Sequence, residues 1–120
     1  MKIRSGFVSN SSSSSFVAFV PTSVDVFKNS ILDEKEIEIF KEAFLDKYRK
    51  RKFLGHDVLV FEGYSGDDGC HNVMDLDSRD LEQCIDYDKN NPWKFANKIY
   101  TEAWRLFNGK ENILFHNEEN

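Results

Sequence analysis

The sequence predicts an α+β domain: a small, mostly antiparallel sheet of about four strands, backed by two long helices and one or two short ones. Three observations support this prediction. Two stretches, 34–52 and 92–107, repeat apolar residues with the period of an amphipathic helix. Four short stretches are rich in β-branched and aromatic residues, as strands are. Finally, strands and helices do not alternate strictly along the chain, which disfavours a parallel βαβ sheet.

The predicted order is strand, helix, helix, strand, strand, helix, helix, strand. The strands are expected at 16–20, 57–62, 71–76 and 113–116, and the glycine-containing segment 65–69 is expected to turn the second strand into the third. Short helices are expected at 24–31 and 78–86, where apolar residues recur at helical spacing after a capping residue.

Capping patterns in the sequence predict where the two long helices begin. Asp33 and Glu36 form the Asp-x-x-Glu pattern of a capping box. Asn91 followed by Pro92 is typical of an N-cap and a first helical residue. Five of the six residues from Lys47 to Lys52 are Lys or Arg, and we interpret this basic cluster as complementing the dipole at the end of the helix over 34–52.

The chain of 120 residues is expected to form a single domain, 1–120. Residues 1–16 would be a Ser-rich segment leading into the first strand, and 117–120 a polar tail. The net charge of −5 disfavours nucleic-acid binding, because nucleic-acid-binding domains are usually basic. The acidic segment 62–88 is either a solvated face or a functional surface, which would be a docking surface for a basic partner or a mimic of nucleic-acid charge. No apolar run is long enough to suggest a membrane span or a signal peptide.

Candidate chemistry is sparse. Cys70 and Cys84 lack metal-type spacing and are expected to be free, buried thiols. Reactive residue types gather only between 67 and 77, where Asp75 and Asp77 would lie on one side of a strand and offer two carboxylates to a cation. Because the pattern completes no established motif, we predict no catalytic residue, no metal and no cofactor, and we expect a protein that is not an enzyme.

A run of serines lies between two apolar pairs, Phe7–Val8 and Phe16–Val17. It is either a flexible linker or a structured loop that binds an anion or accepts a modification. We predict that 6–16 packs against the domain with Phe7 and Phe16 buried. The candidate binding residues are Ser11, Ser12, Ser13, Ser14, Ser15, Asp67, Asp68, Asp75 and Asp77.

The chain begins with Met-Lys-Ile-Arg, one variable residue, and then Gly-Phe-Val-Ser-Asn-Ser-Ser-Ser-Ser-Ser-Phe. This string resembles the N-terminal segment of many small uncharacterised proteins of bacteriophages and bacteria. The resemblance ends after about the first 17 residues. It implies a phage or prophage gene and implies no activity.

We therefore expect an accessory protein that binds another protein of the host or phage, such as an inhibitor of a host factor or defence system, located in the host cytoplasm. Two alternatives stay open. One is a virion component, such as a minor capsid, decoration or internal protein. The other is a small enzyme that uses the Cys70–Asp77 region. Self-association into a homo-oligomer is compatible with any of these.

Overall fold

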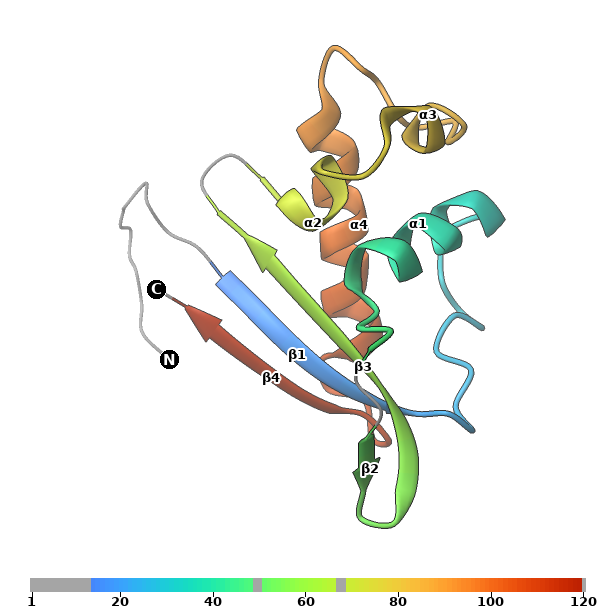
Figure 1. Ribbon diagram of the computed structural model, residues 1–120, viewed down its shortest axis with the longest axis vertical. Helices are drawn as coiled ribbons and strands as arrows, with labels where there is room; N and C mark the ends of the chain where they lie inside the picture. The colour runs from blue at the N-terminus through green and yellow to red at the C-terminus, as the bar shows by residue number, and fades with distance from the viewer. Residues whose placement is uncertain (1–13, 49–50, 67–68, 120) are drawn as a thin grey trace.

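The computed structural model describes residues 14–48, 51–66 and 69–119, which form one four-stranded sheet and four helices (Figure 1). The strands are β1 Ser14–Pro21, β2 Arg51–Phe53, β3 His56–Ser65 and β4 Leu114–Glu119. The helices are α1 Glu34–Phe44, α2 His71–Met74, α3 Ser78–Leu81 and α4 Pro92–Phe107. The strand order is β2-β3-β1-β4, with every neighbouring pair antiparallel. The predicted α+β class is confirmed.

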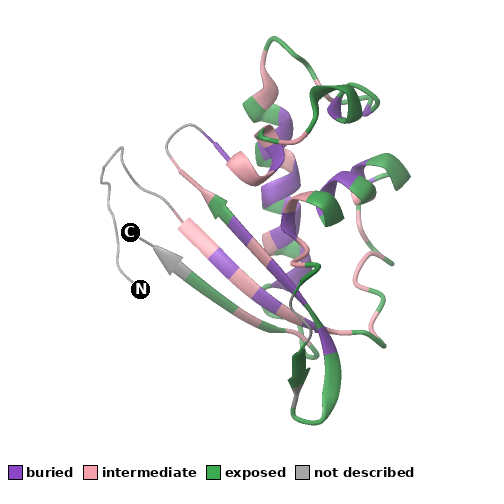
Figure 2. Cartoon of the chain, in the orientation of Figure 1, coloured by how far each residue is buried: buried purple, intermediate pink, exposed green. Residues whose placement is uncertain are grey.

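The helices all lie on one side of the sheet (Figure 1). Along the central strand β1, Phe16, Ala18 and Val20 are buried, whereas the residues between them are only partly buried (Figure 2). This alternation follows from the two-residue period of a strand. The buried set points toward α1 and α4, whose apolar stripes close the core.

Phe16 is the centre of an aromatic core. Its ring centroid lies 5.6 to 5.8 Å from those of Phe44, Tyr100, Phe107 and Phe115. Gly63 is its partner on β3 and leaves the space that the ring fills, because a Cβ at this position would lie 2.4 Å from Phe16 Cε2. The prediction that Phe16 is buried is confirmed, and Phe7 lies outside the described residues.

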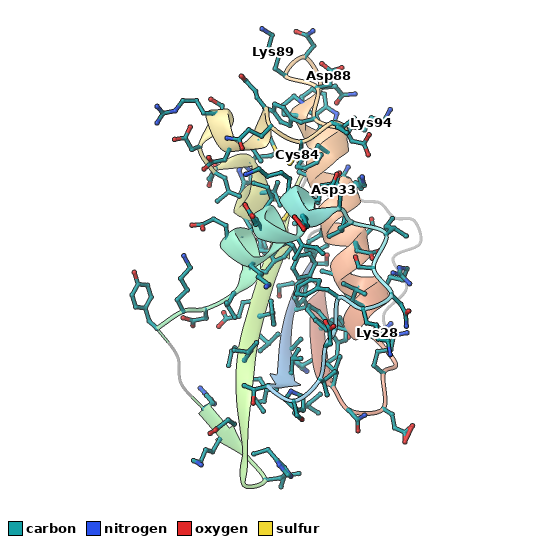
Figure 3. All side chains as sticks on the ribbon, turned by 90° about the vertical axis from the view of Figure 1, so that its right-hand side faces the viewer. Lys28, Asp33, Cys84, Asp88, Lys89 and Lys94 are labelled. Atoms are coloured by element: carbon teal, nitrogen blue, oxygen red, sulfur yellow. The ribbon has the colours of Figure 1, made fainter. Side chains whose placement is uncertain are left out.

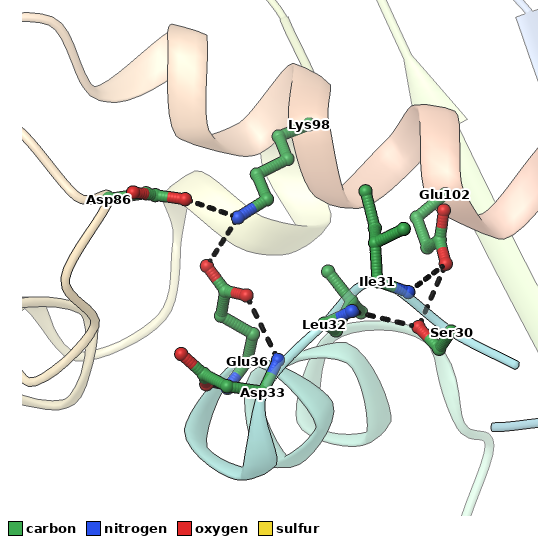
Figure 4. Close-up of polar contacts among 8 residues, drawn as sticks. All are labelled: Ser30, Ile31, Leu32, Asp33, Glu36, Asp86, Lys98 and Glu102. Carbon is green, nitrogen blue, oxygen red and sulfur yellow. Dashed lines mark hydrogen bonds and ion pairs between the residues drawn. The ribbon is translucent and has the colours of Figure 1, made fainter. Parts of the chain in front are cut away.

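A buried carboxylate ties α4 to the segment that precedes α1 (Figure 4). Glu102 accepts hydrogen bonds from the Ser30 hydroxyl at 2.8 Å and from the Ile31 N–H at 3.1 Å. The Arg105 guanidinium pairs with the same carboxylate at 2.7 Å. These donors hold the pKa of Glu102 below its ordinary value, with Arg105 the largest cause.

A second buried carboxylate belongs to α1. The Asp33 side chain accepts from the Glu36 N–H at 2.9 Å, and Glu36 accepts from the Asp33 N–H at 3.2 Å, which confirms the predicted capping box. The other oxygen of Glu36 bonds to Lys98 of α4 at 2.6 Å, and Lys98 also pairs with Asp86 (Figure 4). An ion pair therefore links α1 to α4, and hydrogen bonds to Glu102 link α4 to the segment before α1.

The short helix predicted over 24–31 is wrong. This segment forms successive turns, with backbone bonds from Lys28 to Asp25 and from Ser30 to Phe27. The Asp25 side chain accepts a hydrogen bond from the Phe27 N–H. Near the end of the segment, Glu102 accepts a hydrogen bond from the Ser30 hydroxyl. A helix of two turns is not stable by itself, so these local and tertiary hydrogen bonds decide the conformation.

The helix predicted over 34–52 ends early, at Phe44. Leu45 is extended and forms a bridge with Phe61 of β3, and the Asp46 N–H donates to the Val60 carbonyl at 2.9 Å. Pairing with β3 thus replaces further helical bonds. The interpretation of the basic cluster as a helix C-terminus is also wrong, because Arg51 and Lys52 belong to a strand.

Three further boundaries differ from the predictions. Residues 71–76 are not a strand but contain helix α2, because Asn72 Oδ1 accepts the Tyr64 N–H and its amide donates to the Ala43 carbonyl. The helix predicted over 78–86 shortens to α3 and continues as turns. The polar tail predicted over 117–120 is mostly strand, since β4 runs to Glu119 along β1.

Candidate functional site

The side of the sheet that carries none of the described helices is the first candidate surface. Strand register places Glu62, Val17 and His116 in one row across β3, β1 and β4, and Val60, Phe19 and Leu114 in the next row. On β1, Val17 and Phe19 alternate with the buried residues, so both rows point away from α1 and α4, and Val60 of the second row is itself fully buried. We call this surface the helix-free face.

An apolar hollow of about 540 Å³ opens at one end of the helix-free face. Its wall is formed by three strands, the turn of the β2–β3 hairpin and the loops on either side of the sheet. The lining residues are Phe19, Pro21, Ser23, Val24, Leu54, His56, Val58, Glu111, Asn112, Ile113 and Leu114. Its volume lies within the range of about 300 to 1,000 Å³ that is typical of ligand sites.

The hairpin between β2 and β3 supplies the most exposed apolar side chain of this hollow. Phe53 pairs with His56, so Leu54 and Gly55 form a two-residue turn, and both have positive φ, 53° and 83°. Asn, Asp and Gly are the residues favoured at such positions, whereas leucine is disfavoured. Leu54 is nevertheless 82% exposed, and the fold gains no buried contact from it.

Of the two cations of β2, Arg51 lies beside the hollow. Lys52 and its register partner Asp57 alternate with the lining residue Val58 and therefore lie on the other face of the hairpin. The Arg51 guanidinium is 5.6 Å from the centroid of the Phe19 ring, a cation–π distance. Lys52 lies 3.4 Å from Asp57, and both side chains are largely exposed. Such exposed pairs contribute little stability.

A smaller polar hollow of about 270 Å³ lies toward the other end of β1. It is lined by Ser15, Phe16, Val17, Glu62, Gly63, Tyr64, Asn72 and His116. It brings together a hydroxyl, a carboxylate, a phenol and an imidazole that come from three strands. No motif predicts this set, because strand pairing alone brings these residues together.

The predicted serine site is divided between the two faces of the sheet. Ser14 lies within hydrogen-bonding distance of the Tyr100 hydroxyl, 3.0 Å between the oxygens, and that hydroxyl donates to the Ser14 carbonyl at 3.2 Å. Ser15 lines the polar hollow. Ser11, Ser12 and Ser13 lie outside the described residues.

The predicted carboxylate site is not assembled by the described chain. Asp67 and Asp68 lie outside the described residues. Asp75 follows α2, with its Oδ1 3.7 Å from His71 Nδ1. Asp77 caps α3 and binds Arg79, which lowers the pKa of the Asp77 carboxyl. The two carboxylates therefore contact different residues at the ends of two helices instead of sharing one side of a strand.

Both cysteines are free and buried, as predicted. Burial raises the pKa of the Cys70 thiol to about 11. The pKa of Cys84 is also raised to about 11, first by burial and then by the nearby Glu36 carboxylate. A reactive thiol needs the opposite shift, toward the thiolate at neutral pH.

No group of three His, Cys, Asp or Glu side chains in ranges 14–48, 51–66 and 69–119 is arranged to hold a metal ion. Within the same part of the chain, no helix has the length and apolar character needed to cross a bilayer.

The comparisons with known proteins returned no match: no family model fits this chain, and neither a curated protein nor a solved structure is significantly similar to it.

Proposed function

We propose that this protein is a phage- or prophage-encoded accessory protein that works in the host cytoplasm by binding another protein, and that the partner docks on the helix-free face. One observation carries the choice of surface. The apolar hollow is bordered by two exposed leucines, Leu54 at 82% and Leu114 at 50% exposure. Apolar side chains grouped around a hollow are typical of interaction sites.

Backbone strain supports the same surface. Leu54 keeps a bulky apolar side chain at a turn position where a left-handed backbone conformation is costly by about 1 to 2 kcal/mol. A residue that neither fills the core nor suits its own turn is better explained by contact with another molecule.

The test is affinity purification from cells that express the protein with a C-terminal tag. The hollow variant carries Leu54→Asn and Leu114→Thr, which remove the two exposed leucines. The matched control carries Ile31→Thr and Ile85→Asn, because Ile31 and Ile85 are 69% and 89% exposed and lie outside the hollow. We expect one stoichiometric partner with the wild type and the control, and loss of that partner with the hollow variant.

Two results would reject the proposal. Equal recovery of the partner with both variants would place the contact elsewhere on the molecule. Many copies of the protein in purified phage particles, with no partner outside them, would instead identify a virion component.

A further inference from the structure

The turn after α4 contains the one place in the sequence where glycine follows asparagine, Asn108–Gly109. We propose that Asn108 is a site of spontaneous covalent modification, in which its side chain cyclises with the Gly109 backbone and is converted from an amide to a carboxylate. Asparagine is among the thermolabile residues of proteins. Which asparagines of this chain react in the folded state is decided by the hydrogen bonds and exposure of each one.

The reaction needs only water as a second reactant. The backbone nitrogen of the following residue attacks Cγ of the asparagine side chain. A nitrogen–Cγ bond forms, the Cγ–Nδ2 bond breaks, and ammonia leaves with the proton that the backbone nitrogen gives up. Water then opens the five-membered succinimide at either carbonyl carbon and yields aspartate or isoaspartate. A following glycine favours the attack, because no Cβ crowds the ring.

Asn108 and Gly109 are open to this reaction. Both residues are exposed in the turn that follows α4. Within the described part of the chain, neither the Asn108 side chain nor the Gly109 N–H has a hydrogen-bond partner. A Cβ placed on Gly109 would meet nothing within 4 Å, so the surroundings leave room for the ring.

The backbone of this turn can also reach the reactive conformation. Asn108 is extended, with ψ of 128°, and must rotate about its Cα–C bond before the Gly109 nitrogen meets Cγ. Gly109, which has a positive φ of 77°, accommodates the rotation because glycine is the least restricted residue. The backbone bond across the turn, from the Lys110 N–H to the Phe107 carbonyl, is long at 3.5 Å, and little stability is lost with it.

Asn29 lies beside the same end of α4 and provides the contrast. Its neighbour Lys28 is labelled there in Figure 3, and Asn29 and Arg105 line one hollow. Ser30 has a small side chain, so the sequence would allow the reaction at Asn29 as well. However, the Ser30 N–H donates to the Phe27 carbonyl at 3.1 Å, and the Asn29 carbonyl accepts from Arg105 at 2.9 Å. The nucleophile is engaged, and the backbone is held.

The other described asparagines are held by backbone hydrogen bonds or lack a nucleophile. Proline, which has no N–H, follows Asn91. Regular secondary structure holds the backbone at Asn97 and Asn117. The N–H of the next residue donates to a backbone carbonyl after Asn72, Asn90 and Asn112.

The product places a negative charge at the end of α4. A carboxylate at position 108 opposes the helix dipole, whose C-terminal end is already negative. Isoaspartate also adds one atom to the backbone of the loop between α4 and β4, and residues 111–113 of this loop line the apolar hollow. The modification therefore alters the loop beside the proposed docking surface.

The experiment incubates the full-length protein at pH 8 and follows its intact mass and its peptide map. Each conversion replaces an amino group by a hydroxyl group, and a protein isoaspartyl methyltransferase labels the isoaspartate that forms. We expect Asn108 to be modified first among the described asparagines, and more slowly at pH 6, because the attacking nitrogen must lose its proton. Asn108→Gln should slow the gain of mass, since the longer side chain cannot close a five-membered ring. Asn29→Gln is the matched control and should leave the gain of mass unchanged.

Unfolding separates the effect of the structure from that of the sequence. In guanidinium chloride the Ser30 N–H loses its acceptor, and we expect Asn29 to be modified as well as Asn108. The inference is overturned if the folded protein is modified at Asn29 as fast as at Asn108. It is also overturned if Asn108 of the folded protein stays unmodified when Asn108 of the unfolded protein has been converted. Neither result bears on the proposed docking of a partner, which is measured separately with the hollow variant.

Discussion

At the scale of single residues, the contact between Phe16 and Gly63 leaves no space for a side chain at position 63. We expect Gly63→Ala to lower the free energy of unfolding by about 1 to 3 kcal/mol, because the new methyl group overlaps the Phe16 ring inside a packed core. Gly66→Ala is the control, since its Cβ would meet only the Tyr64 side chain at ordinary contact distance, 3.4 Å. Urea denaturation of both variants is the measurement, and equal losses would contradict the steric account.

The two thiols allow a second test at this scale. Because Cys70 and Cys84 are buried and have pKa values raised to about 11, we expect neither to react with a thiol reagent at pH 8 in the folded protein. Two thiols per chain should react after unfolding in urea. Rapid labelling of the native protein at Cys70 would contradict the burial of this thiol. It would also support the alternative that the Cys70–Asp77 region is a reactive site.

At the scale of elements, replacing Leu54 should stabilise the β2–β3 hairpin while weakening binding of the proposed partner. We expect Leu54→Asn to raise the free energy of unfolding by about 1 kcal/mol, since Asn tolerates positive φ and Leu54 has little contact to lose. Thermal or urea denaturation measures this gain. A loss of stability would show that Leu54 supports the fold, and would remove the argument from backbone strain.

The junction between α4 and the segment before α1 should depend on pH. The folded state lowers the pKa of Glu102, so its contribution is present above the ordinary carboxylate pKa and is lost as the pH falls through the lowered value. We expect Glu102→Gln to cost about 2 kcal/mol at pH 7 and to flatten the dependence of stability on pH below about 5. Urea denaturation between pH 3 and 7 is the measurement. If the free energy of unfolding falls equally with pH in the wild type and in Glu102→Gln, groups other than Glu102 cause the acid sensitivity.

Local signals predicted the elements that are stabilised locally. The capping box of α1 and the Asn91–Pro92 start of α4 act within a few residues, and both helices begin where these signals lie. The end of α1 was not predictable in this way, because β3 competes for the backbone of Leu45 and Asp46. The strand predicted over 71–76 is wrong for a similar reason, since Asn72 forms hydrogen bonds with backbone groups on β3 and α1.

At the scale of the whole molecule, the sheet should be most stable at its centre. Phe16, Ala18 and Val20 are buried in a strand that pairs on both sides, whereas β2 pairs only with β3. We expect the slowest amide hydrogen exchange in β1 and the fastest strand exchange in β2. Exchange followed by mass spectrometry measures the difference. Equal protection of the two strands would indicate that the hairpin is part of the cooperative core.

The candidate surface is also a property of the whole molecule. Composition identified the basic cluster, but the sequence did not predict that Arg51 of this cluster lies over the Phe19 ring at the edge of the apolar hollow. Phe19, Leu54 and Leu114 come from three separate parts of the chain, and only the strand order brings them together. The one local signal was Leu-Gly between two stretches of extended residues, a position where a hairpin turn would favour Asn-Gly or Asp-Gly.

Strand β1 begins inside the serine run, where repeated codons can be gained or lost by mutation. Ser14 and Ser15 are its first two residues, and further serines precede them. If the gene gains or loses one serine codon within this run, the two positions before Phe16 are still occupied by serine. The directions of the side chains along β1 are set by pairing with β3 and β4 and do not depend on the distance from the first codon. The pairing register of β1 therefore stays the same when the serine run gains or loses one residue.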